Sequence, residues 1–139
     1  MLNYATHIKK DSMFNTPPVF SIYVSMLTLE WLKSNGGVEA IESVNKAKSD
    51  LLYDEIDRNS LFKGTAEKED RSIMNVTYVL VDDSKADKFN QMVQNTRING
   101  LKGHRSIGGY RASMYNALPL ESVQVLVDVM QELEENHGN

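Results

Sequence analysis

The residues best suited to chemistry in this sequence are basic side chains gathered around a pair of glycines. His104, Arg105 and Arg111 flank Gly108 and Gly109. No Asp or Glu occurs between residues 88 and 120, so this segment carries a charge of +5 in a chain whose net charge is −4. The five cations are Lys88, Arg97, Lys102, Arg105 and Arg111. Cations held close together attract an anion, and the planar fork of arginine suits carboxylate and phosphate.

The two glycines strengthen this interpretation. Gly108 and Gly109 let the backbone approach closely or adopt positive φ, so the flanking side chains can converge on one small ligand. We therefore expect one anion-binding edge, for a ligand with two negative groups. The alternative is a basic loop that contacts only solvent.

Metal chemistry has little support in the sequence. The three histidines, at positions 7, 104 and 137, have no carboxylate at metal-ligand spacing, and the chain has no cysteine. Asp82 and Asp83 stand at a strand end and could bind a cation. A turn before a helix accounts for them more simply, so we predict no metal site.

Nucleophilic and nucleotide chemistry are also disfavoured. Ser106 and Ser113 have only His104 as a nearby base, and no third group orients that ring. The chain has no Walker loop and no dinucleotide-binding glycine motif after a strand. No residue of this chain is therefore predicted to be catalytic.

Size and composition indicate a globular domain. A chain of 139 residues with 41% hydrophobic residues is long enough to form a core. The absence of cysteine fits a cytoplasmic protein, and no apolar run reaches the length of a membrane span. The acidic pI of 5.3 argues against nucleic acid as the partner.

Residues 1–18 are predicted to form an N-terminal arm, and residues 19–139 a domain. Pro17 and Pro18 keep the preceding backbone out of the helical region. Asn15 and Thr16 therefore have side chains that are free to bind something outside the arm. The alternative is a loop before a helix, with Thr16 as its cap.

The periodicity predicts helices at residues 19–34 and 38–58, with apolar faces in the core. A strand is expected at 72–81, a helix from the Ser84 cap to Asn99, short strands at 101–105 and 110–115, and a helix at 119–136. The predicted fold class is α+β, a small and mostly antiparallel sheet with helices packed on one face. The residues expected on the buried faces of the first two helices are Phe20, Val24, Leu27, Trp31, Ile41, Val44, Ala47, Leu51, Leu52 and Ile56. Those of the second helix expected in water are Glu39, Glu42, Lys46, Lys48 and Asp50.

Three motifs in order resemble the phosphoserine aminotransferase family, which belongs to the fold-type I pyridoxal-phosphate aminotransferases. They are the segment from Ser12 to Pro18, Trp31-Leu32 before Asn35-Gly36-Gly37, and the run from Gly103 to Pro119. The resemblance covers essentially the whole chain but only the C-terminal part of such an enzyme. It implies the C-terminal small domain of a homodimeric enzyme. That enzyme transfers an amino group between L-glutamate and 3-phosphohydroxypyruvate, giving O-phospho-L-serine and 2-oxoglutarate in serine biosynthesis.

The resemblance also implies roles for five residues. Arg111 resembles the arginine that pairs with the substrate α-carboxylate. His104 and Arg105 resemble the pair that holds the substrate phosphate or the side-chain carboxylate of glutamate. Asn15 and Thr16 resemble residues that reach across the dimer to the phosphate of pyridoxal 5'-phosphate.

The Schiff-base lysine of the family, and the aspartate that pairs with the cofactor's pyridine nitrogen, lie in an N-terminal domain that these 139 residues do not contain. We therefore expect the chain alone to be inactive and not to bind the cofactor by itself. Two alternatives remain open: a stand-alone module that binds anions without catalysis, and an oligomerisation module. The latter predicts exposed apolar surface around Phe14, Phe20 and Trp31.

Overall fold

The computed structural model describes residues 2–137 and divides the chain into two compact units, Met1–Val38 and Glu39–Asn139. The predicted boundary after residue 18, between an N-terminal arm and a domain, stays a prediction.

The first unit contains two helices, α1 (Tyr4–Ile8) and α2 (Val19–Ser34). Asn3 caps α1 by accepting a hydrogen bond from the backbone N–H of Ala5 at 3.0 Å. Pro18 precedes α2, which has no side-chain cap, so the alternative that made Thr16 a cap is wrong. The helix ends where Gly36 adopts a φ of 91°, in the left-handed region that glycine tolerates.

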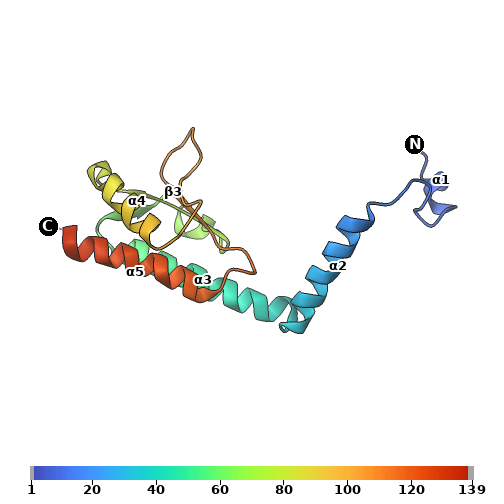
Figure 1. Cartoon of the computed structure of the whole chain (residues 1–139), viewed down its shortest axis with the longest axis horizontal. Coiled ribbons are helices and arrows are strands. Elements are labelled where there is room, and N and C mark those ends of the chain that lie inside the picture. Colours follow the sequence, from blue (N-terminus) through green and yellow to red (C-terminus); the bar gives the residue numbers. More distant parts are fainter. Residues whose placement is uncertain (1, 138–139) are drawn as a thin grey trace. The chain divides into compact units, whose positions relative to one another are not determined.

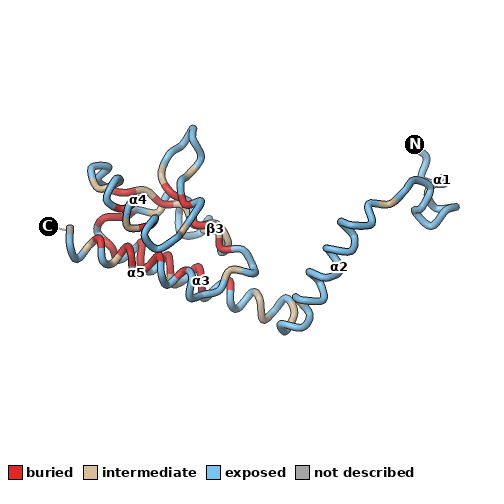
Figure 2. The backbone as a smooth tube through the Cα atoms, in the orientation of Figure 1, coloured by how far each residue is buried: buried red, intermediate tan, exposed pale blue. Residues whose placement is uncertain are grey.

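The apolar face of α2 is exposed. None of its residues is buried, and Phe20 and Trp31 are 80% and 40% exposed. Figure 2 shows the helix in the exposed colour along its length. The prediction of a buried α2 face is therefore wrong for this chain, although the helix itself was predicted correctly. Phe14, 52% exposed, completes the exposed apolar set that the oligomerisation alternative named.

The second unit begins within α3 (Gly37–Arg58) and has an antiparallel three-stranded sheet in the order β1-β2-β3. The strands are β1 (Phe62–Gly64), β2 (Asn75–Leu80) and β3 (Tyr110–Ser113), with α4 (Ala86–Asn95) between the last two and α5 (Leu120–His137) after them. The predicted strand order missed β1. The predicted strand at 101–105 is only a single bridge between Lys102 and Tyr110.

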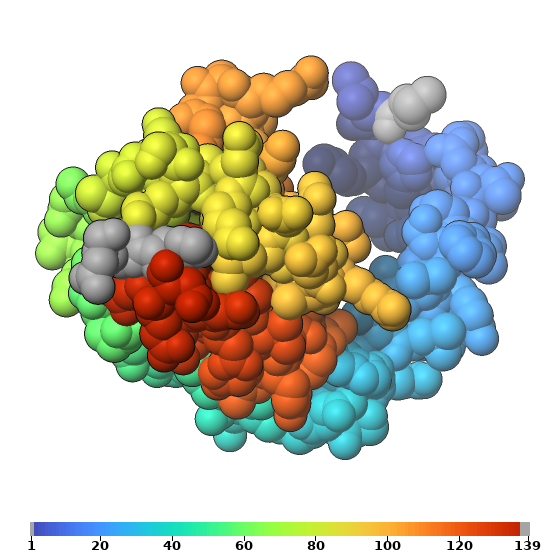
Figure 3. Space-filling model, turned by 60° about the vertical axis from the view of Figure 1, so that its left-hand side comes forward, coloured from blue at the N-terminus to red at the C-terminus, as the bar shows by residue number. Residues whose placement is uncertain are grey.

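The three helices of this unit cover one face of the sheet, as predicted. Along β2 and β3 buried residues alternate with less buried ones, so one face of each strand points into the core. In Figure 1, α3 and α5 run side by side, and Figure 3 shows α5 in red against α4 in yellow. The fold class α+β is therefore confirmed. The most fully buried core residues include Leu52, Ile56, Val76, Tyr78, Phe89, Met114, Met130 and Leu133.

Aromatic side chains connect the sheet to α4. The rings of Phe62, Tyr78, Phe89 and Tyr110 contact one another with centroids 5.0 to 5.8 Å apart, and three of these four contacts are edge-to-face. Each such buried ring stabilises the fold by about 2 to 3 kcal/mol through the surface it removes from water. This cluster lies directly under β3, which carries Arg111.

The entry to α4 differs from the predicted one. Lys85, not Ser84, is the residue before α4, and Asp82 caps the turn that precedes it by accepting a hydrogen bond from the Ser84 N–H at 2.9 Å. A 3₁₀ turn, η2 (Asp83–Lys85), then leads into the helix. This agrees with a turn before a helix for Asp82 and Asp83. The helix ends at Asn95, earlier than the expected Asn99, and Arg97 just beyond it has a φ of 61°, which a right-handed helix does not allow.

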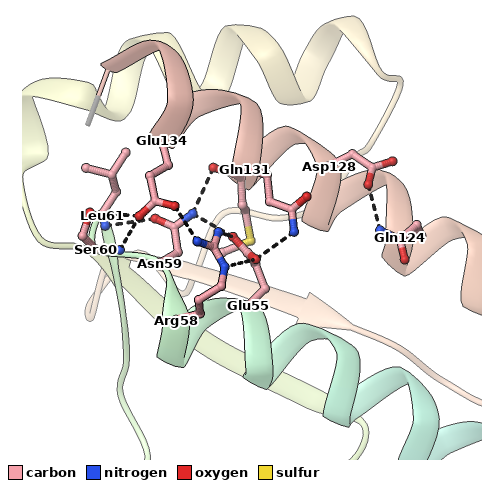
Figure 4. A network of polar contacts seen from close by, with 10 residues as sticks. Glu55, Arg58, Asn59, Ser60, Leu61, Gln124, Asp128, Gln131 and Glu134 are labelled. Atoms are coloured by element: carbon pink, nitrogen blue, oxygen red, sulfur yellow. Dashed lines mark hydrogen bonds and ion pairs between the residues drawn. The ribbon is translucent and has the colours of Figure 1, made fainter. Parts of the chain in front are cut away.

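A polar network joins α3 to α5 (Figure 4). The buried carboxylate of Glu55 accepts hydrogen bonds from Arg58, Asn59 and Gln131 at 2.7 to 3.1 Å. Arg58 also pairs with Glu134 at 2.8 Å. With these partners a buried charge is satisfied, which fixes the register of the two helices.

Among residues 2–137, no helix is both long and apolar enough to cross a membrane. Nor do those residues place three His, Asp or Glu side chains around one point, as a metal site would need.

Candidate anion-binding site

The basic loop is an extension of the sheet at the start of β3. The N–H of Arg111 donates to the carbonyl of Leu101 at 2.7 Å, and the N–H of Gly103 donates to the carbonyl of Gly109 at 2.8 Å. With the bridge between Lys102 and Tyr110, these bonds close a hairpin whose tip is residues 104–108. The orange segment that stands out from the second unit in Figures 1 and 3 is this loop.

Glycine is required at two positions of the loop. A Cβ on Gly103 would lie 2.2 Å from the carbonyl oxygen of Gly108, which is far inside contact distance. Gly109 has a φ of 66°, and a Cβ there would lie 2.9 Å from the carbonyl oxygen of Tyr78. The expected positive φ or close backbone approach at Gly108 and Gly109 is therefore confirmed, and the convergence of the flanking side chains on one ligand stays a prediction.

His104 is oriented by Ser106. Its Nδ1 lies 2.7 Å from the Ser106 hydroxyl and accepts the Ser106 backbone N–H at 3.3 Å. A neutral ring in this arrangement carries its proton on Nε2, which then donates outward. The sequence analysis weighed Ser106 only as a nucleophile. Its spacing of two residues from His104 is the signal for this local bond.

The guanidinium groups of Arg105 and Arg111 have no partner among the described residues, since neither takes part in an ion pair or side-chain hydrogen bond. Both residues are exposed. Five N–H donors on each are therefore available to an anion. This is the property that the charge pattern predicted.

Arg111 lies on the open face of the sheet, directly opposite Thr77 of β2. The hydroxyl of Thr77 is 2.6 Å from that of Thr65, which continues the same row. One hydrogen bond between two hydroxyls uses one proton, so the pair keeps a second O–H for another acceptor. Neither threonine was predicted, because only the strand register places Thr77 opposite Arg111, and only the contact with Thr77 brings in Thr65.

The structure places the predicted substrate residues in two different hollows. Arg111 lines a hollow of about 350 Å³ between β3 and the start of α5. His104 and Arg105 line another of about 600 Å³, together with Asp83 and Asn90. One ligand that contacts all three residues therefore needs more surface than this chain supplies, or a movement of the loop. The substrate roles of these residues stay predictions.

Asn15 and Thr16 belong to the first unit. Both are exposed, and their side chains make no hydrogen bond with other described residues. The side-chain amide of Asn15 and the hydroxyl of Thr16 are the kind of donors that hold a phosphate. The residues present thus fit the phosphate of a cofactor, and their assigned role stays a prediction.

Comparison with known proteins defines the class. A family model described as aminotransferase class-V matches residues 1–126. This chain belongs to the aminotransferase class-V family.

Within that class, the chain is similar to phosphoserine aminotransferases. It is 65% identical to the one from Flavobacterium psychrophilum over 134 residues, which are 96% of this chain and 38% of that protein. The solved phosphoserine aminotransferase from Bacillus circulans subsp. alkalophilus superposes with a TM-score of 0.87 at 39% identity, covering 97% of this chain and 38% of that one. The pyridoxal-phosphate-bound enzyme from Trichomonas vaginalis gives a TM-score of 0.80 at 36% identity, covering 92% of this chain and 37% of that one. The chain thus spans less than two fifths of the length of these relatives.

Proposed function

We propose that this chain is the substrate-binding C-terminal domain of a phosphoserine aminotransferase. The enzyme would transfer an amino group between L-glutamate and 3-phosphohydroxypyruvate, giving O-phospho-L-serine and 2-oxoglutarate. The observation that carries the proposal is the pair of unpartnered guanidinium groups, Arg105 and Arg111, in a chain this similar to such enzymes.

In this proposal Arg111 binds the α-carboxylate that every substrate of the reaction shares. A bidentate pair with its planar fork fixes the amino acid about its Cα. The edge strand β3 holds the Arg111 backbone through the register with Thr77, so little further ordering is needed when the substrate binds.

His104 and Arg105 bind the other end, either phosphate or the side-chain carboxylate of glutamate. With Nδ1 engaged by Ser106, His104 donates through Nε2, while Arg105 supplies the charge. A substrate without the second anion leaves these groups unpaired, so it is rejected.

Asn15 and Thr16 would hold the phosphate of pyridoxal 5'-phosphate, reaching to it from the other subunit of a homodimer. When bound, that cofactor supplies the electron sink for the amino transfer. The 139 residues alone are then inactive and do not hold the cofactor by themselves. A cytoplasmic location, suggested by the cysteine-free composition, is part of the same proposal.

The test is an assay of an intact enzyme that carries these residues at its C-terminus. It should aminate 3-phosphohydroxypyruvate with glutamate as donor. This chain alone should show no turnover, and mixing it with a separately produced N-terminal domain should restore some. An intact enzyme with no such activity would refute the proposal.

A further inference from the structure

Lys48 is the most unusual polar residue of the second unit. It lies in the middle of α3, is 0% exposed, and its ammonium contacts no carboxylate among the described residues. The sequence analysis placed Lys48 in water, and this was wrong. Burial lowers the pKa of its amine.

The ammonium is satisfied by backbone. Its Nζ donates to the carbonyl oxygens of Met114, Tyr115 and Leu118 at 3.1, 2.9 and 3.1 Å. A lysine has three N–H donors, so all three are used. Burial of an ion with only neutral partners is costly, and full hydrogen bonding is what makes it tolerable.

A second side chain one turn earlier holds the same segment. Asn45, also buried, donates from Nδ2 to the side-chain oxygen of Asn116 at 2.8 Å. Lys48 therefore binds the backbone, and Asn45 the side chain of Asn116, in one segment that lies 66 to 71 residues away in sequence. We call these two residues the α3 clamp.

The clamped stretch, residues 114–118, follows directly after β3. Its first residue, Met114, is buried and donates its N–H to the carbonyl of Met74 at 2.7 Å. Met114 and Leu118 line the same hollow as Arg111, which lies three residues before Met114. The clamp thus determines where one wall of that hollow lies.

A purely stabilising role explains this arrangement poorly. Residues 115–117 are exposed, so the loop between Met114 and Leu118 buries little side-chain surface that could fix its path. An apolar side chain at position 48 would avoid the burial of a charge. The ammonium instead fixes one backbone path for a loop that contributes few side chains to the core.

We propose that Lys48, assisted by Asn45, is a positioning residue that fixes the segment after β3 and thereby holds Arg111 in register for the substrate carboxylate. The inference about substrate rests on the proposed function. The positioning of residues 114–118 does not depend on it.

The positioning can be tested on this chain because it contains no cysteine. Lys48→Cys is alkylated in denaturant, either with 2-bromoethylamine to rebuild an ammonium or with iodoethane to leave an uncharged chain, and then refolded. Hydrogen exchange is measured at the N–H groups of Met114 and Leu118. Lys46→Cys, treated identically, is the matched control, because Lys46 lies on the same helix and is exposed.

We expect the ethylated Lys48→Cys protein to exchange at Met114 and Leu118 at least about tenfold faster, with the core amides of residues 127–133 unchanged. Aminoethylation should restore slow exchange at Met114 and Leu118. At position 46 neither reagent should change the exchange rates of these two N–H groups. Equal protection in the ethylated and aminoethylated forms would overturn the proposal. If the ethylated form fails to fold, the Asn45→Ala variant tests the clamp in its place. Faster hydrogen exchange confined to residues 114–118 would support the clamp, and unchanged exchange would overturn it.

The link to substrate is tested in the intact enzyme with Lys48→Met against Lys46→Met. We expect Lys48→Met to raise KM for the amino-acid substrate about tenfold while kcat stays within about threefold, because uniform substrate binding is weakened. The same KM in both variants would overturn the positioning of Arg111. An enzyme inactive in every form would refute the proposed function, and the exchange comparison would still decide the clamp.

Discussion

Two pairs of arginines in the second unit have opposite surroundings. Arg58 and Arg71 each form a two-pronged pair with a carboxylate. Arg58 binds Glu55 at 2.8 and 3.1 Å, and Arg71 binds Asp57 at 2.6 and 2.9 Å. These carboxylates raise the pKa of both guanidinium groups. Arg105 and Arg111 have no such partner among the described residues.

The difference separates arginines whose charge is paired within the fold from arginines whose charge is not. Arg71 also lies 4.4 Å above the ring of Tyr53, so it is held on two sides by its own chain. Arg111 stands on an edge strand opposite Thr77, and only its backbone is held by other described residues. A guanidinium left unpaired by the fold is free to bind an anion from outside.

The largest effect is expected from Arg111→Ala in the intact enzyme. Loss of a charged pair with the substrate carboxylate should lower kcat/KM by about 100-fold to 1,000-fold, equivalent to about 3 to 4 kcal/mol. Arg111→Lys should recover only part of this, because a point charge replaces the fork. The free energy of unfolding should change little. A variant with a lower free energy of unfolding and an unchanged kcat/KM would instead place Arg111 among the arginines that stabilise the fold.

Gly103→Ala should have the second-largest effect on the kinetics of the intact enzyme. The added Cβ clashes with the Gly108 carbonyl at 2.2 Å, so the loop must shift and carry His104 and Arg105 with it. We expect an increase in KM for phosphoserine of about 10- to 100-fold, from a local cost of about 1 to 3 kcal/mol. Gly64→Ala is the control, since its Cβ would lie 3.4 Å from its nearest neighbour. Equal kinetics in the two variants would show that loop geometry does not matter.

Arg71→Ala should produce the opposite pattern to Arg111→Ala. Removing the pair with Asp57 and the contact with Tyr53 should reduce the free energy of unfolding by about 1 to 2 kcal/mol. The KM for phosphoserine should be unchanged. Urea unfolding of this chain and kinetics of the intact enzyme measure the two quantities. A raised KM without lost stability would assign Arg71 to the site.

The smallest expected effect is on the stability of the fold at acidic pH. Arg71, and then Lys68, lower the pKa of Asp57 from 3.8 to about 2. Because the folded state holds the proton more weakly, the pair stabilises the fold above about pH 4, and this contribution is lost as pH falls from about 4 to 2. Asp57 is 35% exposed, so we expect about 1 kcal/mol. Asp57→Asn should remove this pH dependence in thermal unfolding between pH 5 and pH 2.5. If the variant lost stability over that range as much as the unmodified chain, the pair of Asp57 and Arg71 would not stabilise the fold.

Much of the fold follows from local pattern. The bounds of α2 and α3 were predicted within a residue, because Pro17 and Pro18 stop any earlier helix and Asn35 to Gly37 separate the two. β1 was missed because three residues carry too little alternation to be seen. The exposure of α2 was missed because periodicity shows that a face is apolar but not whether the same chain covers it.

Local pattern also limited how much of the candidate site could be predicted. The charge pattern predicted His104, Arg105 and Arg111 as site residues, and their binding roles stay predictions. The bond between His104 and Ser106 is local, whereas the position of Thr77 opposite Arg111 depends on strand register, which a local window does not show. Lys48 shows this most clearly: on an exposed helix face it would be ordinary, and only residues 114–118 make it a buried clamp.

The central claim is that the unpaired arginines bind opposite ends of one doubly anionic amino acid. A crystal structure of an intact enzyme carrying these residues, with O-phospho-L-serine bound, tests it most directly. We expect the α-carboxylate in a two-pronged contact with Arg111 and the phosphate in contact with Arg105 and His104 of the same ligand. A ligand that leaves Arg105 or Arg111 unpaired, as each is in this chain, would contradict the claim.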